Sequence, residues 1–160
     1  MKQLYLLRHG HSTDKGVGYT DKQRELSSIG MLQCHSVGRF LASRSFPIEL
    51  ILTSDAQRAL ATTSLITSHL NISNESILHE PNLYQTSIPA MLELLHLHDS
   101  FQHIIIVGHN PTLSYFAEHF TSENIGEIPP GTLLILRGSF SSWRNMSKGN
   151  MQLVEKFIPD

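Results

Sequence analysis

The sequence holds a single cysteine, Cys34, and few charged residues, which make up 16% of its 160 positions. One cysteine excludes an intrachain disulfide and any zinc site built from several thiolates. Twelve basic side chains against fourteen acidic ones leave a formal net charge of −2. Without an excess of basic residues, the chain lacks the net positive charge typical of proteins that bind nucleic acid or an anionic membrane. An anion must therefore be held by a local cluster of donors.

Long apolar runs are also missing. No run approaches the ~18 residues that a membrane-spanning helix needs, and the apolar stretch before Arg8 is too short for a signal peptide. We therefore expect a cytoplasmic protein with no membrane partner. Hydrophobic residues still make up 40% of the sequence, enough for the core of one domain over residues 1–160. We expect this domain to be a monomer that uses no cofactor.

Short apolar runs alternate with helical patterns along the chain. The runs predict strands at residues 4–7, 48–53, 77–80, 104–107, 132–136 and 151–157. Helices are predicted to begin at Ser27 or Ser28, near Ala56, at Ser87 and at Asn110. The first helix is expected to bury one apolar stripe, formed by Met31, Cys34, Val37 and Leu41. This alternation predicts an α/β fold, a three-layer αβα sandwich around a mostly parallel central sheet.

Reactive side chains follow three of the predicted strands. The first strand ends in Arg8-His9-Gly10 and the most apolar one in Gly108-His109-Asn110. The second strand is followed by Ser54, with Arg58 in the first turn of the next helix. Ligands of parallel sheets bind outside the carboxyl ends of the strands. We therefore expect two arginines and two histidines to converge on one face of the molecule.

This set of side chains indicates anion binding combined with nucleophilic catalysis. Guanidinium groups match phosphate oxygens in bidentate fashion, and backbone N–H groups at the helix that begins near Ala56 add positive potential. A neutral imidazole is a competent nucleophile near pH 7. Gly10 is expected to let the phosphate approach the backbone closely. One histidine would attack phosphorus, and the other, if protonated, would stabilise the charge on the oxygens.

The motifs RHG, SDAQRALAT and VGHNP, in this order and each after a predicted strand, resemble the histidine phosphatase (phosphoglycerate mutase-like) superfamily. The segments ELSSIG and EPNLY and the short chain are most similar to the SixA-type phosphohistidine phosphatases. The motifs span residues 3 to about 116. The resemblance implies a phosphoglycerate mutase-like fold and a metal-independent reaction. It also implies that His9 becomes phosphorylated, that Arg8, Arg58 and His109 form the phosphate pocket, and that water releases the phosphate.

The sequence departs from the family pattern, and one departure concerns the proton donor for the leaving group. Lys15 stands where mutase-type relatives have asparagine, and Asn110 stands where the acid-phosphatase branch has its aspartate. Glu80 is the nearest candidate for a general acid and Asp14 a weaker one. General acid catalysis is worth roughly 10²–10⁴ in rate, but a labile P–N bond needs it less than an alkoxide ester does. The sequence therefore favours protein phosphohistidine as substrate over small phosphomonoesters.

Two alternatives stay open at this point. One keeps the His9 nucleophile but acts on small phosphomonoesters, with Glu80 as general acid. The other is a phosphate-binding module without turnover. The remaining histidines give no metal-ligand spacing, since His96 and His98 point in different directions on a helix, and His9 and His11 lack a third ligand. The polar segment from Gly10 to Glu25 is long for a connection inside a domain, which often marks a functional loop.

Overall fold

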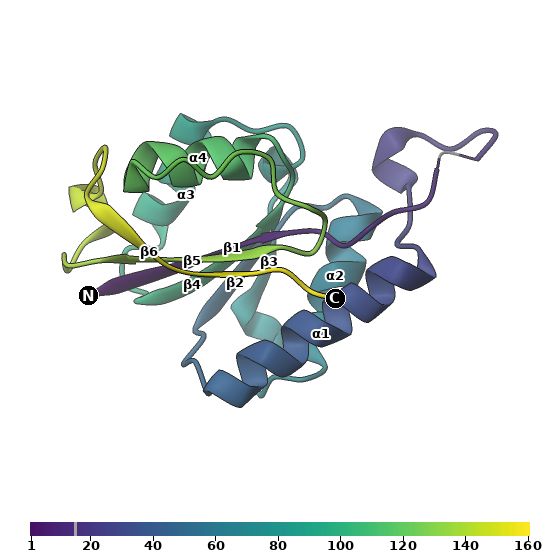
Figure 1. Cartoon of the computed structure of the whole chain (residues 1–160), viewed down its shortest axis with the longest axis horizontal. Helices are drawn as coiled ribbons and strands as arrows, with labels where there is room; N and C mark the ends of the chain where they lie inside the picture. Colours follow the sequence, from purple (N-terminus) through teal and green to yellow (C-terminus); the bar gives the residue numbers. More distant parts are fainter. Residues whose placement is uncertain (15) are drawn as a thin grey trace.

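The computed structural model describes residues 1–14 and 16–160, so Lys15 lies outside the described residues. Strands and helices alternate along the chain (Figure 1). The strands are β1 (Lys2–Arg8), β2 (Leu50–Thr53), β3 (Ile77–His79), β4 (His103–Gly108), β5 (Leu133–Gly138) and β6 (Met151–Phe157). The helices are α1 (Ser28–Arg44), α2 (Gln57–Thr67), α3 (Ile88–Leu97) and α4 (Thr112–Thr121). Within the described part of the chain, no helix combines the length and apolarity needed to cross a membrane.

The strands form one sheet in the order β3-β2-β4-β1-β5-β6. Parallel pairing joins β3 to β2, β2 to β4 and β4 to β1, whereas β5 runs antiparallel to both of its neighbours. Helices α1 and α2 cover one face of the sheet, and α3 and α4 cover the other (Figure 1). The predicted three-layer sandwich with a mostly parallel sheet is therefore confirmed.

Strand β4 shows why its sequence is apolar without interruption. Ile104 and Ile106 pack in the core on the α3–α4 side, and Ile105 and Val107 pack in the core on the α1–α2 side. All four side chains are fully buried. A strand covered on both faces has no solvent-exposed positions, so it does not alternate between apolar and polar residues.

The start of α1 brings the helix very close to the segment that follows β1. Ser27 is the N-cap, and its hydroxyl accepts the Gly30 N–H at 3.0 Å. Met31, expected in the core, is 48% exposed. The buried stripe begins at Gly30 and continues at i+4, i+7 and i+11 through Cys34, Val37 and Leu41. Glycine takes the first position because a Cβ there would overlap the His11 carbonyl oxygen.

The sheet register brings the catalytic candidates to one edge. In the parallel pairs, Arg8 lies beside Gly108 and Thr53 lies beside Val107. The carboxyl ends of β1, β2 and β4 are therefore nearly level, and the three segments that follow them leave the sheet together. The topology alone makes their side chains neighbours.

We predict that Gly30→Ala lowers the free energy of unfolding by about 1–3 kcal/mol, the usual cost of overpacking. The added methyl group would meet the backbone of His11, which cannot rotate away as a side chain can. Urea unfolding measures the change. Gly108→Ala is the matched control, because a Cβ at Gly108 would meet only the side chain of Leu113 at an ordinary 3.6 Å. Equal losses for both variants would contradict the close approach of α1 to the His11 backbone.

Candidate active site

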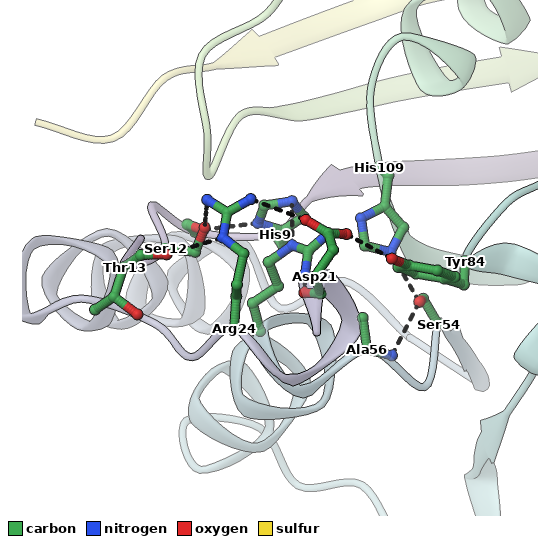
Figure 2. Close-up of polar contacts among 11 residues, drawn as sticks. His9, Ser12, Thr13, Asp21, Arg24, Ser54, Ala56, Tyr84 and His109 are labelled. Carbon is green, nitrogen blue, oxygen red and sulfur yellow. Dashed lines mark hydrogen bonds and ion pairs between the residues drawn. The ribbon is translucent and has the colours of Figure 1, made fainter. Parts of the chain in front are cut away.

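A cavity of about 480 Å³ opens at the edge where β1, β2 and β4 end. Arg8, His9, Arg58 and His109 all line it, so the structure brings together the four residues that the sequence placed at the strand ends. Figure 2 shows His9 and His109 on either side of Asp21. The remaining lining residues are His11, Ser12, Asp14, Asp21, Arg24, Tyr84, Gln85, Asn110 and Pro130.

The hydrogen bonds of His9 leave one ring nitrogen free to act as a nucleophile. Nδ1 lies 2.7 Å from the Gly10 carbonyl oxygen. A carbonyl can only accept, so Nδ1 carries the hydrogen of the neutral ring. Nε2 then keeps its lone pair, and it accepts the Nε–H of Arg58 at 3.2 Å. The lone pair of the His9 ring therefore lies on Nε2, directly beside the Arg58 guanidinium.

The surroundings of His9 keep this ring neutral. The side chain is only 7% exposed. Burial, together with the charges of His109, Arg58 and Arg8, lowers the pKa of His9 to about 3, although the hydrogen bond to Gly10 opposes the change. At neutral pH the ring is unprotonated, which is the form that attacks.

His109 faces His9 across the cavity, with 5.0 Å between the ring centroids. Its Nε2 lies 2.8 Å from the Ser54 hydroxyl, which already accepts the Ala56 N–H at 3.2 Å. When the Ser54 hydroxyl donates its proton to Nε2 of His109, the hydrogen of the neutral His109 ring lies on Nδ1. That nitrogen lies on the side of His9 and Asp21 (Figure 2).

The pKa of His109 bears on the expectation that the second histidine of the site is protonated. Burial and Arg58, with a smaller contribution from Arg8, lower the pKa of His109 to about 4. The ring is therefore neutral at neutral pH and becomes a cation only if a bound anion raises its pKa. The Ala56 N–H, expected to add positive potential for an anion, is already bonded to Ser54.

Arg58 is 5% exposed and binds a residue that the sequence did not single out. Its two Nη groups donate to the backbone oxygen of Asp21 at 2.7 Å and to the Asp21 carboxylate at 3.1 Å. Asp21 begins the 3-10 turn η1 (Asp21–Gln23), inside the long polar loop. Its carboxylate also accepts hydrogen bonds from Tyr84 and Arg24.

The hydrogen bond from Tyr84, and then those from Arg24 and Arg58, hold the pKa of Asp21 far below its usual range. Asp21 is therefore an ionised carboxylate that cannot donate a proton. The same contact with Asp21 raises the pKa of Tyr84. Two signals in the sequence pointed toward these residues: the length of the loop that holds Asp21, and the EPNLY segment that ends in Tyr84.

Arg8 reaches the cavity with part of its guanidinium uncommitted. Nη1 donates to the Ile128 carbonyl oxygen at 2.6 Å. The buried Nε–H finds no partner among the described residues. A buried donor without an acceptor is unfavourable.

Gly10 and Glu80 occupy places other than those expected. A Cβ on Gly10 would lie 2.8 Å from the Gly30 carbonyl oxygen and 3.0 Å from Cys34 Sγ, so this glycine allows contact with α1 rather than with phosphate. Glu80 follows β3, where its N–H donates to the Thr53 carbonyl at 2.8 Å, and it does not line the cavity. Nothing in its position supports a role as general acid. Asp14 does line the cavity, with an exposed side chain.

No three His, Cys, Asp or Glu side chains gather as metal ligands within the described residues. Arg8, Arg58 and His109 line the cavity with nitrogen donors of the kind that bind oxyanions.

Comparisons with known proteins agree with this geometry. Residues 4–87 match the model of the histidine phosphatase superfamily (branch 1). An uncharacterized chloroplastic protein of Arabidopsis thaliana is 34% identical over 91 residues, a match that covers 56% of this chain and 41% of that protein. The chain thus spans less than half the length of the curated relative that it matches.

Solved structures show the same fold at low identity. SixA from Agrobacterium tumefaciens, whose proposed activity is that of a phosphohistidine phosphatase, superposes with a TM-score of 0.85 at 24% identity, over 99% of this chain and 98% of that one. The protein histidine phosphatase SixA complexed with tungstate gives a TM-score of 0.84 at 19% identity, over 98% and 97%. A mycobacterial glucosyl-3-phosphoglycerate phosphatase gives 0.70 at 15% identity, over 96% and 97%.

The depressed pKa values of His9 and His109 predict that neither ring titrates between pH 8 and pH 5 in the ligand-free protein. Because vanadate brings negative charge, its binding should move the pKa of His109 up toward the ordinary value of about 6.5. Histidine ring NMR measures both states. Rings that titrate near pH 6.5 without ligand would contradict the neutral pair.

The lowered pKa values of His9 and His109 also determine how the free energy of unfolding changes with pH. Below about pH 6.5, these two histidines take up protons in the unfolded chain but not in the folded one. The free energy of unfolding should therefore decrease as the pH falls from about 6.5 toward 4, and less steeply in a His9→Ala/His109→Ala variant. Urea unfolding at several pH values checks the slope.

Proposed function

The chain belongs to the histidine phosphatase superfamily, and on that premise we propose that it hydrolyses protein phosphohistidine through a phosphorylated His9. The observation that carries the proposal is the neutral His9 ring, with its Nε2 lone pair beside Arg58 in a cavity lined by the ionised carboxylate of Asp21. We also propose that residues 1–160 form a single domain, and that the protein is monomeric and cytoplasmic.

In the first step, Nε2 of His9 attacks phosphorus while the bond from phosphorus to the substrate imidazole breaks. The substrate ring, protonated on its other nitrogen, leaves with the bonding electron pair as neutral imidazole. Arg8, Arg58 and the Nδ1–H of His109 would bind the phosphoryl oxygens, whose charge is greatest in the transition state. In the second step, water attacks phosphorus, the bond to Nε2 breaks, and the ring regains its lone pair. The proton of the attacking water stays on the released phosphate or passes to bulk water.

The protonation states of the lining residues support phosphohistidine over phosphate esters. Asp21 is ionised and the pKa of Tyr84 is raised, so these two groups are poor proton donors at neutral pH. An alkoxide leaving group needs a donor worth roughly 10²–10⁴ in rate. An imidazole that leaves from a labile P–N bond is far less dependent on one.

A second candidate is the hydrolysis of small phosphomonoesters. It is favoured by the shared fold of the mycobacterial glucosyl-3-phosphoglycerate phosphatase and by Asp14, an exposed carboxyl at the cavity rim that can exchange protons with solvent. Glu80, the acid suggested by the sequence, lies outside the cavity lining. A phosphate-binding module without turnover is the third reading.

We predict that the purified protein releases phosphate from a phosphohistidine peptide faster than from a sugar phosphate. His9→Ala should abolish turnover of both, because no covalent intermediate can form. Glu80→Gln and Asp14→Asn should leave phosphohistidine turnover within about threefold of wild type, since the P–N bond needs little acid catalysis. Phosphate release from each substrate is the measurement, and trapped label on the enzyme should be acid-labile and base-stable.

Two outcomes would overturn this proposal. Faster turnover of the sugar phosphate, lost in Asp14→Asn or Glu80→Gln, would establish the phosphomonoesterase. Vanadate binding with no release of phosphate from either substrate would establish the binding module.

We further predict that EDTA leaves phosphatase activity unchanged, because the charge that binds phosphate comes from the guanidinium groups of Arg8 and Arg58. The measurement is phosphohistidine turnover before and after dialysis against EDTA. Loss of activity that added zinc restores would contradict the metal-independent mechanism.

A further inference from the structure

Thr62, on α2, joins two catalytic segments although it does not line the cavity. Its hydroxyl donates to the Arg58 carbonyl oxygen at 2.7 Å, one helical turn earlier. The hydroxyl oxygen of Thr62 in turn accepts the Gly10 N–H at 3.1 Å, from the segment that follows His9. Thr62 is completely buried, so water cannot replace either bond. One side chain thus ties the turn of Arg58 to the turn of His9.

The hydroxyl of Thr62 has no alternative orientation. A hydroxyl offers one proton and two lone pairs. The proton goes to Arg58, one lone pair to Gly10, and the other to the thiol of Cys34 at 3.4 Å. Burial raises the pKa of Cys34, so the thiol keeps its proton and remains a donor. Every hydrogen-bonding position of the hydroxyl is therefore in use.

Gly10 needs such external restraint because glycine is the residue with the greatest backbone freedom. Its N–H is held by Thr62, and the following peptide is held through the His11 N–H, which donates to Gln33 at 2.8 Å. Between these two bonds lies the Gly10 carbonyl oxygen, the acceptor for His9 Nδ1. The position of this oxygen determines which ring nitrogen of His9 carries the hydrogen.

On the basis of the proposed function, we infer that Thr62 is a positioning residue for the nucleophile. Its hydroxyl holds Gly10 so that the Gly10 carbonyl selects the His9 tautomer with a lone pair on Nε2. The same hydroxyl holds the turn of Arg58, whose Nε lies 3.2 Å from that lone pair. Thr62 therefore controls both the tautomer of His9 and its distance from the cation.

Thr63 provides a matched control on the same helix. It is 4% exposed, and its hydroxyl lies 3.0 Å from the Ala59 carbonyl oxygen, the same i−4 contact that Thr62 makes with Arg58. Its other partner is Thr53 Oγ1 on β2, at 2.9 Å. Thr63 thus resembles Thr62 in burial and helical bonding but does not bond to the His9 turn.

The experiment compares Thr62→Val, Thr62→Ser and Thr63→Val. Thr62→Val should lower kcat on phosphohistidine peptide by about 10–100-fold, since small misplacements of reacting groups cost up to about 10²-fold. KM and vanadate affinity should change less than about threefold, because Arg8, Arg58 and His109 keep their side chains. Thr62→Ser retains the hydroxyl and should restore kcat, whereas Thr63→Val should lose stability without losing kcat.

A second readout does not depend on turnover. In the wild-type protein, ¹⁵N NMR should show His9 as one tautomer, protonated on Nδ1, and Thr62→Val should show a mixture. If the wild-type protein fails to hydrolyse phosphohistidine but this change appears, the proposed function fails and the role of Thr62 stands. If Thr62→Val does not fold, Thr62→Ala removes the same hydroxyl without crowding the core.

Two results would overturn the inference. One is a folded Thr62→Val or Thr62→Ala protein with a single His9 tautomer and unchanged kcat. The other is an equal loss of kcat in Thr62→Val and Thr63→Val, since a merely structural role predicts that the two variants behave alike.

Discussion

The contact between the Arg58 guanidinium and His9 Nε2 is the interaction on which the other features of the site depend. A permanent cation 3.2 Å from a ring nitrogen opposes protonation of that nitrogen. Burial of the ring acts in the same direction, and the pKa of His9 falls to about 3. The fold brings these groups together through the parallel register of β1, β4 and β2, which makes the strand ends level. Burial of His9, and then the cations beside it, thus keep its ring unprotonated.

A buried guanidinium is costly unless an anion accompanies it. Asp21 meets this need, because its carboxylate contacts both Arg58 and Arg24 and is ionised. A bound phosphoryl group brings the same kind of charge to Arg58. Asp21 and the substrate therefore compete for the donors of one side chain or share them. This relation accounts for an acidic residue in a cavity lined by several cations.

The sequence predicted the parts of the site that follow from strand order. Arg8, His9 and His109 stand at strand ends, and parallel pairing alone brings such residues together. It could not predict Asp21 or Tyr84, because their contacts depend on the path of a long loop and on a turn after β3. Gly10 and Met31 were misplaced for a related reason. Periodicity shows that a helix packs on the sheet, but only the close approach of Gly30 to His11 shows which residues face inward.

A low pKa has a cost for catalysis, because a less basic nitrogen is also a weaker nucleophile. The substrate itself reduces this cost. Its negative charge offsets the field of Arg8 and Arg58, which raises the basicity of His9 when phosphorus comes within reach. The ring cannot take a proton from solvent before substrate binds, and it becomes more nucleophilic only beside the atom that it attacks. Such a mechanism demands a fixed ring, since a tautomer exchange would turn an N–H toward phosphorus. The hydrogen bonds that the Gly10 and His11 N–H groups donate to Thr62 and Gln33 fix the carbonyl that prevents this exchange.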